Sequence, residues 1–145
     1  MAVNLRHKKA RMIRDFMIET KTLEMFKEEE RDDTIFFRSI YPMAENDNKQ
    51  VVITINDTVY LGVQSLLLNE VPEECNPALL DCLNECNLEL PTVKYVLTKD
   101  QCVVVSMFFP ADHDHFNAGL IMGAIVELMK NVSQKHYAKI KAAIV

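Results

Sequence analysis

Four consecutive residues in the last third of the chain carry side chains that bind metal ions: Asp112, His113, Asp114 and His115. In an extended segment alternate side chains point the same way, so the two histidines would come together. A metal site needs more ligands converging from elsewhere, and His7 and His136 are the only other histidines. We favour a simpler interpretation, in which the run is a solvated loop and Asp112 or Asp114 caps a following helix.

The four cysteines are a second candidate for metal or redox chemistry: Cys75, Cys82, Cys86 and Cys102. Cys82 and Cys86 are four residues apart and share one face of an expected helix, where their thiolates could join a zinc or iron–sulfur site. That face also carries Leu79 and Leu83, which must be buried for the helix to pack. Because free cysteine is among the most buried residue types, we favour reduced thiols in the core.

The three glycines of the chain exclude the common nucleotide-binding loops: Gly62, Gly119 and Gly123. Phosphate-binding loops need clustered glycines so that the backbone can approach the anion, and neither G-x-x-x-x-G-K nor G-x-G-x-x-G is present. The sequence also has no G-x-S-x-G, H-E-x-x-H or C-x-x-C motif. We therefore expect no catalytic residues, no bound metal and no cofactor, and a protein that is not an enzyme. A small metal-dependent enzyme or sensor that uses the Asp112–His115 run is the alternative.

Composition limits the partners that this chain can have. Its 145 residues suffice for one domain, 1–145, and 49% of them are hydrophobic. The net charge of −5 argues against nucleic acid, because phosphate contacts need a concentrated positive surface. No signal-peptide-like stretch begins the chain, and the longest apolar run, from Ala118 to Val126, is too short to cross a bilayer. We expect a cytoplasmic protein that binds neither nucleic acid nor membrane.

Hydrophobic periodicity predicts one helix and three strands in the first half of the chain. Apolar residues recur every three or four positions from about Leu5 to Phe26, which is typical of a helix. Three segments rich in β-branched and aromatic residues follow and predict antiparallel strands, at Thr34 to Tyr41, Val51 to Asn56 and Val59 to about Leu67. In the second of these strands Val51, Ile53 and Ile55 share one face and Val52, Thr54 and Asn56 the other, which indicates a sheet with one covered face and one that is partly solvated.

The second half of the chain predicts helix, two strands and helix. Asn76 is a plausible N-cap and Pro77 stands in the favoured first position of a helix that runs to about Asn87. Strands follow at 93–97 and 102–109, and a last helix runs from Phe116 to about Ile144. The resulting order, α-β-β-β-α-β-β-α, predicts an α+β fold with about five antiparallel strands and three helices.

The first predicted helix has charges that oppose its dipole. Its first turns are basic, with Arg6, Lys8 and Lys9 among them, and acidic residues from Glu28 to Asp33 follow its end. A helix dipole favours the reverse arrangement, so we expect packing to hold this helix. The basic side chains are more simply a solvated face than a nucleic-acid site, because no aromatic residues are interleaved with them.

The element order and one segment resemble the YbjN family of bacterial sensory transduction regulators, whose fold is similar to that of type III secretion chaperones. The resemblance spans roughly Thr34 to Val145 and is carried by "LLDCLNECNLEL", Leu79 to Leu90, and by the hairpin "VKYVLTKDQCVVVSMFF". Leu83, Asn84 and Asn87 match the leucine- and asparagine-containing signature of the family. The resemblance implies a small, often dimeric protein that binds other proteins and catalyses no reaction.

Adaptable apolar side chains near the last strand and helix are candidates for a partner-binding surface. Methionine adjusts its shape to varied partners, so we expect a peptide-accepting surface that includes Met107, Phe109, Met122 and Met129. The alternative for these residues is ordinary core. Because the last helix is apolar around most of its circumference in its first half, we also expect a homodimer. The sequence does not identify the protein or peptide partner.

Overall fold

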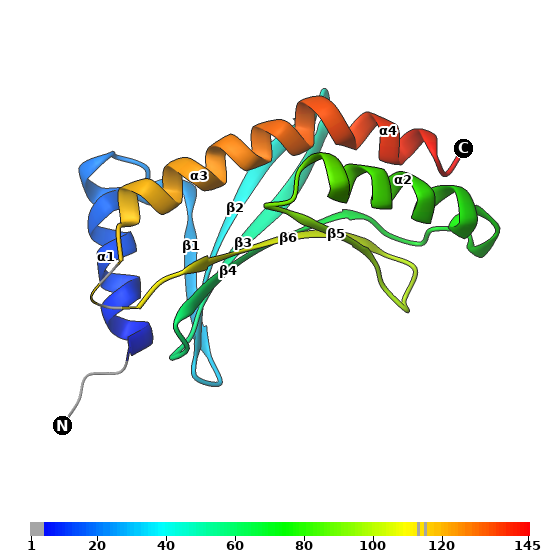
Figure 1. Cartoon of the computed structure of the whole chain (residues 1–145). Coiled ribbons are helices and arrows are strands. Elements are labelled where there is room, and N and C mark those ends of the chain that lie inside the picture. The colour runs from blue at the N-terminus through cyan, green and yellow to red at the C-terminus, as the bar shows by residue number, and fades with distance from the viewer. Residues whose placement is uncertain (1–4, 113, 115) are drawn as a thin grey trace.

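The computed structural model describes residues 5–112, 114 and 116–145 (Figure 1). One antiparallel sheet of six strands, in the order β1-β2-β3-β4-β6-β5, has its helices on a single face. The strands are β1 (Lys27–Arg31), β2 (Thr34–Ala44), β3 (Asp47–Ile55), β4 (Tyr60–Leu68), β5 (Lys94–Leu97) and β6 (Val103–Pro110). The α+β class and the antiparallel sheet are therefore as the sequence predicts.

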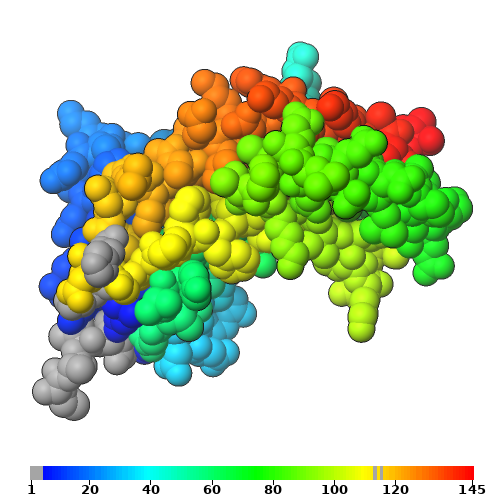
Figure 2. All heavy atoms as spheres, in the orientation of Figure 1, coloured from blue at the N-terminus to red at the C-terminus, as the bar shows by residue number. Residues whose placement is uncertain are grey.

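Three helical bodies cover the sheet. They are α1 (Leu5–Glu19), α2 (Asn76–Glu89), and the pair α3 (Ala118–Asn131) and α4 (Tyr137–Ala142), which a π-helical turn η3 (Val132–His136) joins. Short 3₁₀ turns, η1 (Leu23–Met25) and η2 (Glu73–Cys75), stand after α1 and before α2. Helix α1 packs on β2, β3 and α3, whereas α2 packs on β5 and α4. Figure 2 shows the residues of α2, in green, beside those of α4, in red. Within the described residues, no helix is both long enough and apolar enough to cross a membrane.

Alternation along the strands places the core between the sheet and the helices. Val51, Ile53 and Ile55 of β3 are buried, as the sequence pattern predicts, while Val52 and Thr54 between them are partly exposed. The central strands β4 and β6 contribute further buried residues from the same face: Leu61, Val63, Leu67, Val103, Val105 and Met107. None of the described helices covers the opposite face of the sheet (Figure 1).

The strand count is a correction, because the structure has six strands and the sequence pattern predicts about five. The additional strand, β1, has the sequence KEEER and is exposed along its whole length. Charged residues are depleted in strands, and they are a common device for protecting a sheet edge. Hydrophobic periodicity therefore carries no signal for this strand.

The first helix is also shorter than predicted. It ends at Glu19 instead of near Phe26, because Lys21 adopts a left-handed φ of 59°. The amide of Thr22 donates to the carbonyl of Met17 at 2.8 Å, and that of Lys21 to Ile18 at 3.2 Å. This is a Schellman C-cap, which usually has glycine where the chain has Lys21.

The cap predicted for α2 is wrong in detail. Pro77 does stand in the first turn of the helix, but Asn76 is already helical and the N-cap position is Cys75, which makes no side-chain cap. The Asn76 amide instead pairs with the side chain of Gln101, which donates to its carbonyl oxygen at 2.9 Å. Asn76 therefore joins the start of α2 to the β5–β6 turn.

The last helix differs from the prediction at its start and in its middle. Neither Asp112 nor Asp114 is its N-cap, because Asn117 holds that position and accepts from the amide of Leu120 at 3.0 Å. The π-helical turn inserts a wider turn before α4, and both His136 and Tyr137 are then buried. The expected continuous helix to Ile144 is therefore two α-helices.

Candidate functional site

The structure separates the four residues expected on a partner-binding surface. Met107 and Met129 are buried, Met122 is 8% exposed, and Phe109 is half-buried. Met122 and Met129 lie together in the floor of one groove, which neither Met107 nor Phe109 reaches. The two methionines are thus covered by the protein itself, and the rim residues of this groove are better placed to meet a partner.

The groove lies between α3 and the β2 side of the sheet and has a volume of about 290 Å³. None of its lining residues is charged: Met25, Phe26, Ser39, Ile40, Tyr41, Pro42, Val51, Ile53, Met122, Ile125, Val126 and Met129. Three of these residues are well exposed, Met25 at 62%, Ile40 at 58% and Val126 at 61%, but alternation along β2 directs the side chain of Ile40 to the opposite face of the sheet. The sequence pattern did not single out these three, because they come from a 3₁₀ turn, a strand and a helix that are distant in the chain.

One edge of β2 runs along this groove. Strand β1 pairs with β2 only from Thr34 to Arg38, whereas β3 pairs with it as far as Ala44. Among the described strands, none pairs with β2 beyond Arg38 on the β1 side. Pro42 fits such an edge, because a proline within a sheet is tolerated where its nitrogen faces outward.

The histidine and cysteine clusters show no metal geometry where the structure describes them. His113 and His115 lie outside the described residues, and within those residues no three His, Cys, Asp or Glu side chains form a metal-binding group. All four cysteines are free thiols, and Cys86 is buried with Leu79 and Leu83, as the helix pattern predicts. Burial raises the pKa of the Cys86 thiol to about 12, which keeps it protonated.

A buried polar contact joins the C-terminal helices to the sheet. His136 is fully buried, and its Nδ1 pairs with the hydroxyl of Tyr95 at 2.7 Å. Its Nε2 lies 3.5 Å from a carboxylate oxygen of Glu89. Burial lowers the pKa of His136 despite this carboxylate, and it raises the pKa of Tyr95. This contact lies in the core and ties the π-helical turn to β5.

Asn87, one of the residues that carry the family resemblance, has a defined structural role. Its side-chain oxygen accepts from the amide of Tyr95 at 2.7 Å, and its side-chain nitrogen donates to the carbonyl of Tyr95 at 3.1 Å. The side-chain amide of Asn87 thereby forms the two hydrogen bonds that a neighbouring strand would otherwise form with Tyr95 at the edge of β5. Leu83 is buried in the same helix, while Asn84 is exposed.

The basic start of α1 is a correction to the expected solvated face. Lys9 is fully buried, and its Nζ donates to the carbonyls of Thr58 and Tyr60 at 2.8 and 3.0 Å. Asp57 accepts from both the main-chain amide and the side chain of Arg6, at 3.0 and 2.6 Å. An acid from the β3–β4 turn therefore supplies the negative charge that the first turn of α1 lacks.

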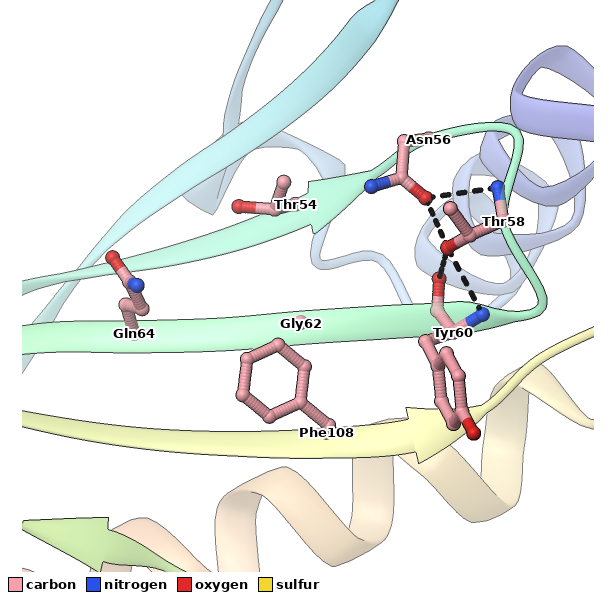
Figure 3. A pocket seen from close by; sticks show the side chains of 7 residues that line it. All are labelled: Thr54, Asn56, Thr58, Tyr60, Gly62, Gln64 and Phe108. Carbon is pink, nitrogen blue, oxygen red and sulfur yellow. Dashed lines mark hydrogen bonds between the residues drawn. The ribbon is translucent and has the colours of Figure 1, made fainter.

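A second hollow lies on the face of the sheet opposite the described helices (Figure 3). Its volume is about 430 Å³, and seven uncharged residues from β3, the β3–β4 turn, β4 and β6 line it: Thr54, Asn56, Thr58, Tyr60, Gly62, Gln64 and Phe108. The hydroxyl and amide of Thr58 both donate to the side-chain oxygen of Asn56, at 2.5 and 3.0 Å. The sequence pattern did not reveal this hollow, although alternation along β6 places Phe108 on the face opposite Met107.

Comparison with known proteins does not assign the chain to a family. No protein-family model matches the chain, and no curated protein sequence matches it significantly. The resemblance to the YbjN family therefore remains a prediction from the residues that carry it.

Proposed function

We propose that this chain is a non-catalytic protein-binding module with a chaperone-like or regulatory role. The observation that carries the proposal is the uncharged groove of about 290 Å³ that runs beside the unpaired edge of β2. The resemblance to the YbjN family and to secretion chaperones supports the same function. The alternative, a metal-dependent enzyme or sensor, depends on His113 and His115, which lie outside the described residues.

An extended polypeptide segment is the partner that suits this groove. A strand added beside β2 would hydrogen-bond to its free main-chain groups, and every second side chain would point toward α3. Apolar side chains at those positions would cover Val126, which water now reaches. Pro42 and the irregular pairing between Pro42 and Ala44 limit the added strand to a short one.

Charge substitutions at the rim test the proposal. We expect Met25→Glu or Val126→Glu to reduce capture of polypeptides roughly tenfold, because a carboxylate in an apolar interface loses its hydration. Leu88→Glu is the matched control, since Leu88 is 74% exposed on α2 and does not line the groove. Capture is measured with the purified chain on an array of unstructured peptides, and circular dichroism verifies folding. Equal capture by all three folded variants would exclude this groove.

Photo-crosslinking locates the contact directly. A benzophenone side chain in place of Val126 should crosslink to the captured peptide, whereas the same group in place of Leu88 should not. Crosslinks that form only from position 88 would show that the peptide binds another surface of the protein and not this groove.

We also propose a homodimer in the cytoplasm. Helix α3 keeps Leu120 at 72% exposure outside the groove, and a Cβ added at Gly123 would meet no atom of the described residues within 4 Å. Glycine inside an exposed helix costs about 1 kcal/mol relative to alanine, so a close partner surface would explain it. Light scattering should give twice the mass of the chain at micromolar concentration. A monomer up to hundred-micromolar concentration would contradict the dimer.

A further inference from the structure

The hollow on the open face of the sheet is separate from the groove of the proposed function. All described helices lie on the other face, so the outward side chains of β3, β4 and β6 remain accessible (Figure 1). The hollow gathers two aromatic rings and four uncharged polar side chains in about 430 Å³, within the usual range for small-ligand sites. This combination is chemically different from the groove, which is almost entirely apolar.

Phe108 and Tyr60 provide an aromatic platform in this hollow. Phe108 is 62% exposed, and its ring lies over Gly62, where a Cβ would stand 3.1 Å from a ring carbon. The absence of a side chain at Gly62 therefore lets the ring rest on the backbone of β4 while its outer side faces solvent. Tyr60 is 54% exposed and lies beside Phe108 at the end of the hollow near the β3–β4 turn (Figure 3).

Hydrogen-bonding groups surround the platform. Thr54 and Gln64 make no side-chain hydrogen bonds within the described part of the protein, and both line the hollow. The side-chain oxygen of Asn56 is occupied by Thr58, which orients the amide and leaves its NH₂ group for a ligand. Amide and hydroxyl groups both donate and accept, so they suit a ligand that is rich in hydroxyls.

We infer that this hollow binds a neutral sugar, with one pyranose ring stacked on Phe108. The C–H groups on the less polar face of a pyranose carry partial positive charge, which the negative face of an aromatic ring attracts. The sugar hydroxyls then reach Thr54, Asn56 and Gln64 at the rim. Because the lining has no lysine or arginine, it offers no positive charge to offset that of a phosphate or a carboxylate.

Amide chemical shifts of the full-length ¹⁵N-labelled chain test the inference. The probes are glucose, galactose, mannose, N-acetylglucosamine and cellobiose, each titrated to about 100 mM because single-ring contacts are expected in the millimolar range. We expect at least one probe to shift the amides of Gly62, Gln64 and Phe108 saturably. No saturable shift with any probe would overturn the inference, and so would tighter binding of glucuronate or adenosine monophosphate at the same residues.

Variants connect the binding to the platform. Phe108→Ala should weaken binding roughly tenfold, through lost stacking and lost apolar contact. Phe108→Leu keeps an apolar side chain without the ring, and should also weaken binding if Phe108→Ala fails to fold. Leu66→Ala is the matched control, since Leu66 is 48% exposed on β4 and lies outside the hollow. Unchanged affinity in a folded Phe108 variant would refute the role of the ring.

The two sites are distinguishable by experiment. Val126→Glu should leave sugar binding unchanged, and Phe108→Ala should leave peptide capture unchanged, because the side chains lie on opposite faces of the sheet. Loss of both activities in either variant would contradict the assignment of separate sites.

Discussion

The two ends of the sheet differ in the polar contacts that supplement the core. At the β1 end, the buried Ala10, Ile13 and Met17 pack α1 into the core. Charged side chains of α1 also meet acids of β1 and the β3–β4 turn: Arg6 with Asp57, His7 with Glu30, and Arg14 with Glu28. At the β5 end, α2 and α4 are held by buried apolar residues and by the contact of His136 with Tyr95. Charges at the surface interact weakly in water. A buried polar group that loses its hydrogen-bond partner is left with neither that partner nor water, which costs more free energy.

This difference predicts how the stability of each end responds to mutation, pH and salt. Contacts at the β5 end should carry large free energies and depend on pH through buried groups. The exposed ion pairs at the β1 end, of His7 with Glu30 and of Arg14 with Glu28, should be individually small and weakened by salt, unlike the buried Lys9 of the same helix.

The largest effect is expected from the core of α2. Leu83→Ala should lower the free energy of unfolding by about 2–5 kcal/mol, because Leu83 is 2% exposed and its truncation leaves a cavity. Lys8→Ala, on α1, should change it by less than about 0.5 kcal/mol. Urea denaturation measures both, and the reverse ranking would show that the helix assignments are wrong.

A smaller loss is expected from the buried lysine of the β1 end. Lys9→Met keeps most of the apolar stem but leaves the carbonyls of Thr58 and Tyr60 without their donor, at a cost of about 1–3 kcal/mol. The matched control is Lys8→Met, since Lys8 makes neither of these hydrogen bonds. Equal free energies of unfolding of the two variants would show that the hydrogen bonds of Lys9 do not stabilise the packing of α1.

The third prediction uses pH to separate His136 from Asp47. The pKa of His136 is lowered by burial, so the folded protein binds fewer protons there than the unfolded chain. Stability from this group is complete above pH 6.5 and falls as the pH drops below that value. The charged and titratable groups nearby are Glu89, Tyr95, Cys86, Lys135 and Lys139.

Asp47 affects stability in a lower pH range than His136 does. The hydroxyl of Tyr137 donates to its carboxylate and lowers its pKa, so its contribution is complete above about pH 3.8 and is lost at lower pH. His136→Gln should therefore flatten the stability profile just below pH 6.5, and Asp47→Asn should flatten it only below about pH 4. Urea denaturation across pH checks both, and an unchanged slope below pH 6.5 in His136→Gln would exclude His136 as its source.

The two ends of the sheet also differ in how much of their structure the sequence predicts. At the β5 end α2, β5 and β6 are predicted by the clear periodicity of Leu79, Leu83, Tyr95 and Val105, but the π-helical turn before α4 is not. At the β1 end the sequence misses β1, a charged edge strand, and the end of α1, which depends on a left-handed lysine, Lys21. The sequence also misses the two hollows that we propose as binding sites, because each joins side chains from segments far apart in the chain that only the folded sheet brings together.

The smallest effect is expected from a surface ion pair at the β1 end. Arg14 donates to both carboxylate oxygens of Glu28, at 2.9 Å each, and both side chains are 37% exposed. A double-mutant cycle with Arg14→Ala and Glu28→Ala should give a coupling free energy of about 0.2–1 kcal/mol. In salt of about 1 M the screening length is about 3 Å, so most of this coupling should vanish. A coupling that persists in salt would mean that the pair is held in a less solvated site, and that the two ends of the sheet differ less than their exposure indicates.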